Sequence, residues 1–337
     1  MMRAWIAAAL LCAAQDQPPG ATPEVLQDLK AYRHKIVYET FKDGNWEIYL
    51  SNADGSGAKN LTSTPDVDEV YPKASPDGTK IVVVADEGKG EAKVRNLYVM
   101  NLDGSARKKI ADNGREPCWS GDSKQVAYLP GEFDKFTYSD FATKGIRMYD
   151  VASEKTRDHP NNAKIHHLYT LNWTPDGKWF IATVHGGMGF KHGLLALAAD
   201  GDAVVDLKLS GCRPDVSPDG KKLIWGHGDF AVGLAELDFS GPQPVAKLLR
   251  NIVESKDPIE TYHCDWSPDM KYVSFTLGPK MKGKNLKGLL PEFPGVEAPG
   301  WNVCIADASQ INRWAAITLD GKSNKESDWV FVPESGR

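Results

Sequence analysis

The sequence lacks the short motifs that mark the common enzyme classes. It has no Gly-x-Ser-x-Gly nucleophile elbow, no His-Glu-x-x-His zinc motif, no Walker phosphate loop and no dinucleotide-binding fingerprint in a strand–helix–strand setting. The stretch "HGGMGF" (185–190) is rich in glycine, but it lies between two predicted strands, which favours a loop over a phosphate cradle. Any catalytic site would therefore have to be assembled from distant segments.

Long apolar runs and an excess of positive charge are also missing. No internal segment reaches the roughly 18 apolar residues that a membrane-spanning helix needs. The formal net charge is −5, from 40 Lys and Arg against 45 Asp and Glu, which argues against a nucleic-acid-binding surface. Apart from Cys12, the cysteines are Cys118, Cys212, Cys264 and Cys304, and their spacing fits neither zinc knuckles nor a redox Cys-x-x-Cys. Buried free thiols are expected, with disulfide pairing left open.

The N-terminal segment differs from the rest of the chain. "MMRAWIAAALLCAA" has one basic residue, an apolar run and then small residues, so residues 1–14 are predicted to be a signal peptide and the protein to be periplasmic or secreted. Residues 15–33 are predicted to form a leader. Within it, "TPEVLQDLKAYR" predicts one short helix with Thr22 as N-cap and with Val25, Leu26 and Leu29 on one face.

Turn-forming residues are abundant, and they recur in a repeated pattern. A Ser-Pro-Asp-Gly turn followed by an alternating apolar run predicts two strands joined by a tight turn. Copies of this pattern are "VYPKASPDGTKIVVV" from Val70, "EPCWSGDSKQVAYL" from Glu116, "TLNWTPDGKWFIAT" from Thr170, "RPDVSPDGKKLIWG" from Arg213, "HCDWSPDMKYVSFT" from His263 and a degenerate "ESDWVFVP" from Glu326. A second hairpin, often with Asp-Gly at its tip, lies between copies, so each unit holds four short strands, as in a propeller blade.

The strand count predicts how the ring closes. The last copy lacks the strand that should follow its turn, whereas an unmatched strand of that type, "HKIVYETF" (34–41), precedes the first hairpin. We therefore predict an all-β fold, a six-bladed β-propeller over residues 34–337 with blades of four antiparallel strands. The C-terminal strand near 328–332 would join the N-terminal three, which leaves no open sheet edge. A monomer is expected.

The repeated "WSPDG" turns and the "IYVMN-DG"-like hairpins resemble the repeats of TolB-type six-bladed propellers. The resemblance covers about residues 34–337. It implies a non-catalytic binding or scaffold protein of the cell envelope, whose partner is an envelope protein, a peptide or a glycan, and which needs no cofactor.

A binding site is predicted at the mouth of the central channel. Each repeat has one residue just before the Pro position of its "P-x-W-S-P" pattern, where the inner strand starts. This column holds Tyr71, Glu116, Thr170, Arg213, His263 and Glu326. A ring of polar, charged and aromatic residues is typical of a ligand-facing funnel, although strand starts at a solvated mouth are often polar anyway. The long loops 130–145 and 278–300 are predicted to be binding elements or lids, or else disordered insertions.

An enzyme is the alternative hypothesis. Propellers of related repeat type, the oligogalacturonate lyases, use histidines and a divalent metal at this mouth. That resemblance would make His166, His167, His185 and His263 the metal ligands or base, with Arg213 holding a substrate carboxylate and Tyr169 or Tyr262 as proton donor. No two of the histidines have His-x-His or His-x-x-x-His spacing, so such a metal site would draw ligands from separate blades.

Overall fold

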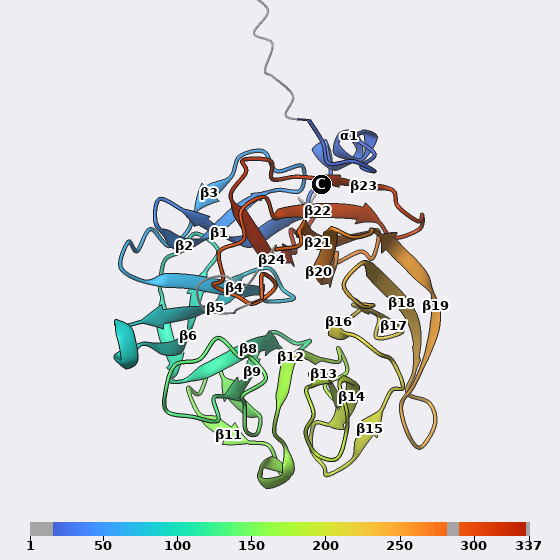
Figure 1. Ribbon diagram of the computed structural model, residues 1–337. Helices are drawn as coiled ribbons and strands as arrows, with labels where there is room; N and C mark the ends of the chain where they lie inside the picture. The colour runs from blue at the N-terminus through green and yellow to red at the C-terminus, as the bar shows by residue number, and fades with distance from the viewer. Residues whose placement is uncertain (1–15, 282–289, 335–337) are drawn as a thin grey trace, which may run out of the picture.

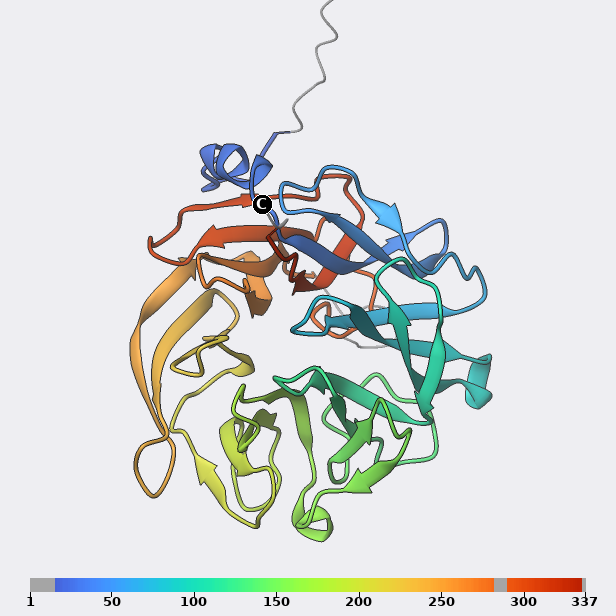
Figure 2. The ribbon, with the colours of Figure 1, turned by 180° about the vertical axis from the view of Figure 1, so that it is seen from behind.

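The chain forms a ring of β-sheets around a central channel. The computed structural model describes residues 16–281 and 290–334, and within these residues there are six antiparallel sheets of four strands each, arranged as blades (Figure 1; Figure 2 from behind). The predicted all-β, six-bladed propeller is confirmed. The predicted signal peptide, residues 1–14, lies outside the described residues and stays a prediction.

Each of the first three blades runs from an inner strand at the channel to an outer strand, and blade 1 takes its inner strand from the C-terminal part of the chain. The strands are, in blade 1, β24 (Ser323–Val330), β1 (Lys35–Lys42), β2 (Asn45–Asn52) and β3 (Lys59–Asn60); in blade 2, β4 (Asp68–Ala74), β5 (Lys80–Glu87), β6 (Val94–Asn101) and β7 (Lys108–Ala111); in blade 3, β8 (Gly114–Trp119), β9 (Gln125–Pro130), β10 (Arg147–Asp150) and β11 (Thr156–Asp158).

The other three blades repeat the arrangement. The strands are, in blade 4, β12 (Leu168–Trp173), β13 (Trp179–Val184), β14 (Gly193–Ala198) and β15 (Val204–Asp206); in blade 5, β16 (Cys212–Val216), β17 (Lys222–Gly226), β18 (Ala231–Asp238) and β19 (Val245–Glu254); in blade 6, β20 (Ile259–Trp266), β21 (Tyr272–Pro279), β22 (Asn302–Asp307) and β23 (Trp314–Ala316). Short 3-10 turns span Gly90–Ala92 and Asn162–Lys164.

Blade 1 closes the ring as predicted. Its inner strand β24 pairs antiparallel with β1, with Lys35 opposite Val330 and Phe41 opposite Ser323. Figure 1 shows β24, from the C-terminal part of the chain, beside β1, from its N-terminal part. β24 begins several residues earlier than the predicted strand near 328–332, because the degenerate last repeat hides its start.

The Ser-Pro-Asp turns owe their recurrence to a side-chain network. In the first copy, the Ser75 hydroxyl donates to Asp77 (2.6 Å) and accepts from the backbone N–H of Lys80 (3.0 Å). The next residue, Gly78, has φ +70°, and a Cβ there would lie 2.0 Å from a backbone oxygen of blade 1. The turn residues thus fix both the hairpin and the close approach of the next blade.

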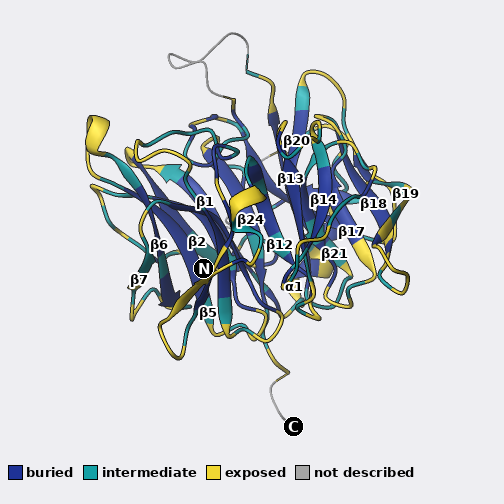
Figure 3. Cartoon of the chain, turned by 90° about the horizontal axis from the view of Figure 1, so that it is seen from below, coloured by how far each residue is buried: buried dark blue, intermediate teal, exposed yellow. Residues whose placement is uncertain are grey.

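The apolar side chains pack between neighbouring blades. One cluster joins blades 3 and 4 through residues such as Leu129, Met148 and Phe180, and another joins blades 5 and 6. Seen from the side, the strands are largely buried, and most exposed residues lie in the loops at the two faces (Figure 3). Burial of this apolar surface between blades is the main favourable contribution to the ring.

The leader helix packs on the outside of the ring. Helix α1 (Glu24–Lys30) buries Val25 and Leu29 in a cluster with residues of blades 1 and 6. Its N-cap is Pro23 rather than the predicted Thr22. Across residues 16–281 and 290–334, no helix is long and apolar enough to span a membrane.

Every inner strand carries a β-bulge. In β4, two residues between Val70 and Lys73 lie opposite a single residue of β5, so β4 has one extra residue there. The same register shift occurs in β8, β12, β16, β20 and β24. The bulges hold six residues with left-handed φ angles between 43° and 57°: Tyr71, Glu116, Thr170, Arg213, His263 and Glu326. The predicted mouth column is therefore the set of bulge residues.

Replacing Thr170 by Gly tests the strain at a bulge. Thr170 has φ 49°, which is costly for a β-branched residue, and its hydroxyl has no hydrogen-bond partner among the described residues. Glycine adopts this conformation freely, so Thr170→Gly is expected to leave the free energy of unfolding unchanged or raise it by up to about 1 kcal/mol. Denaturant unfolding measures the change.

Thr183→Gly is the matched control, because Thr183 lies in the regular strand β13 and accepts the backbone N–H of Arg213 (2.9 Å). This change is expected to cost about 2 kcal/mol. An equal loss for both variants would contradict strain at the bulge.

Candidate functional site

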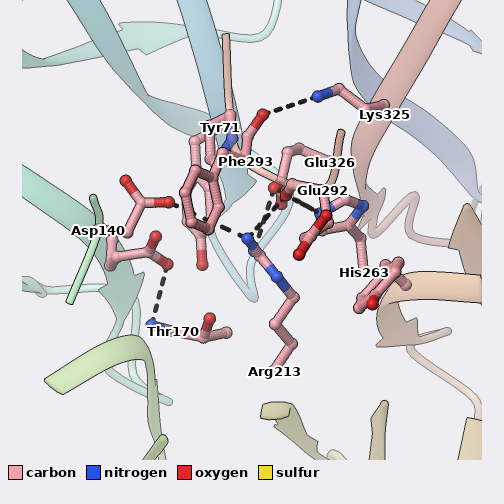
Figure 4. A network of polar contacts seen from close by, with 12 residues as sticks. Tyr71, Asp140, Thr170, Arg213, His263, Glu292, Phe293, Lys325 and Glu326 are labelled. Atoms are coloured by element: carbon pink, nitrogen blue, oxygen red, sulfur yellow. Dashed lines mark hydrogen bonds and ion pairs between the residues drawn. The ribbon is translucent and has the colours of Figure 1, made fainter. Parts of the chain in front are cut away.

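The six bulge residues form one ring inside the channel. Figure 4 shows Tyr71, Thr170, Arg213, His263 and Glu326 pointing toward one another from different blades. The structure thus brings together the residues that the repeat column predicted. Their exposure differs from the prediction, however, because all six are buried, with exposed fractions of 2–9%.

Glu326 is the centre of charge of this ring. Its Oε1 lies 3.1 Å from Arg213 Nη1 and 2.9 Å from His263 Nε2. Burial alone would raise the pKa of Glu326, but His263 and Arg213 outweigh burial and lower the pKa to about 2. Burial lowers the pKa of His263 to about 4, so this imidazole is neutral near pH 7.

A second carboxyl of the ring is in the opposite state. Glu116 accepts the backbone N–H of Thr170 (3.0 Å). Burial, followed by repulsion from Asp140 on the loop 131–146, raises the pKa of Glu116 to about 8. The ring thus holds one ionised and one largely protonated carboxyl near pH 7, which keeps its net charge small.

The chain covers this ring with its own segment 290–298, which lies between β21 and β22. Arg213 Nη2 donates to the backbone oxygen of Glu292 (2.8 Å), and His263 Nε2 donates to the same oxygen (2.7 Å). We call the face with this segment the upper face and the face with the Ser-Pro-Asp turns the lower face. The predicted ligand-facing funnel is instead a buried polar ring. The backbone carbonyl of Glu292, in place of water, accepts hydrogen bonds from Arg213 and His263.

Lys325 holds the segment in place, and nothing in the sequence marked it except its position beside Glu326. Its ammonium donates to the backbone oxygens of Pro291 (2.8 Å), Phe293 (2.7 Å) and Val296 (2.8 Å). Burial lowers the pKa of Lys325 to about 8, and burial raises the pKa of neighbouring Glu39 to about 8. Three carbonyls thus take the place of the hydration shell of a buried cation.

A further buried ion network anchors the loop 131–146, and the sequence analysis did not identify it. Arg95 binds Asp86 with two hydrogen bonds (2.7 and 2.9 Å) and Asp140 with a third (2.9 Å). Asp140 in turn lies 4.0 Å from Arg213. The loop is therefore tied to the central ring through one carboxylate.

A cavity of about 350 Å³ lies on the upper face beside the covering segment. It is lined by Asp140, Phe141, Tyr169, His185, His192, Gly211, Cys212, Arg213, Gly228, Asp229, Tyr262, Leu290, Glu292 and Phe293. Side chains from four blades therefore meet around one space. Four residues of the lyase hypothesis are among them, together with His192, whereas no sequence signal singled out Phe141 or Asp229.

The aromatic side chains of this upper cavity are held by mutual contacts. Phe141 stacks on His185 with ring centroids 4.2 Å apart. The Tyr169 hydroxyl lies 2.7 Å from His192 Nε2, and the Tyr262 hydroxyl donates to Asp229 (2.6 Å). Pre-positioned aromatic walls with a few polar groups are typical of a ligand pocket.

Among the residues that the structure describes, the histidines of the metal and lyase hypotheses do not form a metal-ligand set. His166 and His167 contact each other, and His167 pairs with Glu132 (3.2 Å), but neither lines the upper cavity. His263 uses Nε2 for Glu292 and Glu326, while its Nδ1 lies 2.6 Å from the Thr276 hydroxyl. In residues 16–281 and 290–334, no three His, Cys, Asp or Glu are grouped as metal ligands. The four cysteines 118, 212, 264 and 304 are free thiols, as expected.

Known proteins resemble this chain in part of its sequence and in its fold. The Tol-Pal system protein TolB of Francisella tularensis subsp. tularensis (strain WY96-3418) is 28% identical over 164 residues, which is 49% of this chain and 35% of the relative. The match thus spans about a third of the length of that relative. The crystal structure of TolB from Acinetobacter baumannii superposes with a TM-score of 0.61 at 18% identity, covering 88% of this chain and 66% of that one. The fold is a TolB-like six-bladed β-propeller.

The same architecture also occurs outside that group. A chain of the nidogen/laminin complex superposes on this TolB-like propeller with a TM-score of 0.57 at 11% identity, covering 88% of this chain and 98% of that one. No protein-family model matches the chain. A shared fold does not identify the ligand, which depends on the residues of the site.

The buried imidazole of the TolB-like propeller predicts a pH dependence of stability. The pKa of His263 is about 4 in the folded protein and 6.5, the ordinary value, in the unfolded chain. Between pH 4 and pH 6.5 the unfolded chain therefore binds more protons than the folded protein. Stability contributed by neutral His263 is complete above pH 6.5 and is lost as the pH falls toward 4, by at most about 3 kcal/mol.

His263→Gln is expected to flatten this part of the stability–pH curve, measured by denaturant unfolding at several pH values, relative to the wild type. Equal slopes for His263→Gln and the wild type would contradict the assignment.

Lys325→Met tests what holds the covering segment. Without the ammonium, three carbonyls lose their donor, so amides in 290–298 are expected to exchange hydrogen at least about tenfold faster. Lys322→Met, at an exposed position just before the same strand, is the control and should leave exchange unchanged. Unaltered exchange in Lys325→Met would show that the segment does not depend on this lysine.

Proposed function

We propose that this TolB-like propeller is a non-catalytic binding protein of the cell envelope that holds a segment of a partner protein in the upper cavity. The observation that carries the proposal is the aromatic cavity of about 350 Å³, whose walls come from four blades and from the covering segment. Its volume suits one or two side chains of an inserted segment rather than a large cofactor.

The chemistry of the walls indicates what such a segment would carry. Phe141, Tyr169 and Tyr262 offer apolar and aromatic surface, which favours an inserted aromatic or aliphatic side chain. The carboxyls of Asp229 and Glu292 outnumber the single guanidinium of Arg213, and that guanidinium is already bound. A segment with an apolar anchor and a neighbouring basic residue would therefore match the cavity better than an acidic one.

The relatives support the setting of this activity. The relatives that this chain matches are described as Tol-Pal system proteins, and the match spans only about a third of their length. A related role in the envelope is therefore part of the proposal, as is export by the predicted signal peptide, residues 1–14. A periplasmic location would give the upper cavity access to envelope proteins.

The uronate-lyase hypothesis has no specific support in the geometry. The guanidinium of Arg213 is engaged by Glu326 and by the backbone of Glu292, so it is not free to hold a substrate carboxylate. His263 is likewise buried and engaged. The hypothesis stays an untested prediction of the sequence.

Site-directed photocrosslinking tests the proposed binding. Leu290 lines the upper cavity and is 51% exposed, whereas Ile311 is equally exposed (53%) but lies outside that cavity. With p-benzoylphenylalanine in place of Leu290, cells of the source organism are expected to yield one discrete adduct, identified by mass spectrometry as an envelope protein. The same label in place of Ile311 should give none.

Phe141→Ala removes one aromatic wall and should reduce the adduct at position 290 at least about tenfold, since burial of an aromatic contact contributes 1–2 kcal/mol or more. An adduct that is insensitive to this change, or labels at 290 and 311 that give the same products, would contradict binding in the upper cavity.

A further inference from the structure

The channel holds the covering segment through its main chain. Four carbonyl oxygens of residues 291–296 accept hydrogen bonds of 2.7–2.8 Å from Lys325, Arg213 and His263 (Figure 4). A fifth carbonyl oxygen accepts a longer bond, of 3.5 Å, from Arg95. In the part of the chain that the structure describes, none of these donors is hydrogen-bonded to a side chain of the segment. The contacts therefore depend on the path of the backbone more than on its sequence.

The donors come from four different blades. Lys325 lies on β24, Arg95 on β6, Arg213 on β16 and His263 on β20, and each of them is more than nine-tenths buried. Buried donors of this kind need acceptors close by, because removing them from water is costly. Donors from separate blades that converge on one short stretch of backbone are typical of a site that binds a peptide.

The blades do not include this segment. Residues 290–296 belong to no strand. The connection between the second and third strands spans 280–301 in blade 6, whereas it spans only 227–230 in blade 5 and 43–44 in blade 1. Four residues or fewer can thus make the same connection. The covering segment is an addition to the repeat, and the strand pairing of blade 6 does not require it.

The covering segment has a defined shape, made of two consecutive turns. The N–H of Phe293 donates to the backbone oxygen of Leu290 (3.2 Å), and that of Val296 donates to the backbone oxygen of Phe293 (3.2 Å). The second turn has Pro294 followed by Gly295 with φ +73°, the order that a type II turn favours. These turns direct three carbonyl oxygens to a single ammonium group.

We infer that the buried ring and the donors beside it form a binding site for a polypeptide turn, recognised by its backbone carbonyls, and that residues 290–296 are an internal ligand of this site. The ligand class is a Pro-Gly double turn. A partner protein that carries such a turn would displace the internal ligand. Because the segment also forms part of the wall of the upper cavity, its release would join the ring to that cavity. Binding at the ring does not depend on whether a partner also binds in the upper cavity.

Fluorescence anisotropy with the peptide fluorescein-LPEFPGV-amide, the sequence of residues 290–296, tests this site. Gly295→Val is expected to bind the peptide at least about tenfold more tightly than the wild type, because a β-branched residue at φ +73° is strained and loosens the internal ligand. Gly300→Val is the matched control, at a glycine with φ +85° in the same connection but outside the internal ligand. It should bind as weakly as the wild type, and equal affinities of all three proteins would overturn the site.

Deletion of residues 290–296 is the second variant, and it removes the internal ligand altogether. It is expected to bind the peptide more tightly than Gly295→Val does, and circular dichroism shows whether its ring is folded. Absence of binding by the folded deletion variant would contradict the inference. Since this measurement involves no cellular partner, such a result would leave the photocrosslinking at position 290 unaffected.

Peptides with one amide replaced by an E-alkene test recognition of the main chain in the deletion variant. An alkene between Glu292 and Phe293 removes the carbonyl that accepts two hydrogen bonds from the ring, and it should weaken binding at least about tenfold. An alkene between Gly295 and Val296 removes a carbonyl without a partner among the described residues, and it should weaken binding less than about threefold. Each change also removes one turn N–H, so the two are matched. Equal losses would show that the carbonyls are not what is recognised.

The same peptide with Leu290→Ala and Glu292→Gln tests the side chains. Both residues line the upper cavity, so this peptide should bind within about threefold of the original. A loss as large as that from the first alkene would show that side chains hold the segment, and it would overturn recognition through the backbone.

Discussion

The left-handed bulge in each inner strand is the constraint on which the rest of the channel depends. Holding an ordinary residue in this conformation costs about 1 kcal/mol or more, and the ring does so six times. The conformation persists because neighbouring blades bind the backbone it exposes: the N–H of Tyr71 bonds to Glu39 of blade 1, and that of Thr170 bonds to Glu116 of blade 3. At these two bulges, and at Arg213, whose N–H bonds to Thr183 of blade 4, the bulge therefore joins two blades.

Six inward side chains in a narrow channel create an electrostatic problem, which the structure solves by pairing charges rather than by admitting water. Glu326 lies between Arg213 and His263, and Lys325 is surrounded by carbonyls of the covering segment. Breaking such a buried pair is costly, whereas its net contribution to stability is small. These contacts consequently determine the position of the segment 290–298, and so the shape of the cavity beside it, more than they determine how stable the ring is.

The repeat carries enough information to predict the architecture, because each turn and each alternating strand follows from local chemistry. Ser75 and Asp77 favour a turn through hydrogen bonds within their own segment, and the unmatched strand "HKIVYETF" indicates how the ring closes. The column of bulge residues was also predictable as a ring, since it stands at a fixed distance from each turn. Its burial was not, because that depends on Lys325 meeting three carbonyls some 30 residues away. Nor was the Arg95–Asp140 pair, in which a side chain of strand β6 meets a loop that has no repeat signature.

The closure of blade 1 has a mechanical consequence. Lys35 and Val330 are opposite each other at one end of the β1–β24 pair, so the preceding and following parts of the chain leave from the same end of that pair. A pull between them would load the backbone hydrogen bonds singly, in the manner of a zipper, instead of shearing all of them at once. The ring should resist tension applied across its blades far better than tension applied between its ends, and a tether at one end alone would spare this seam.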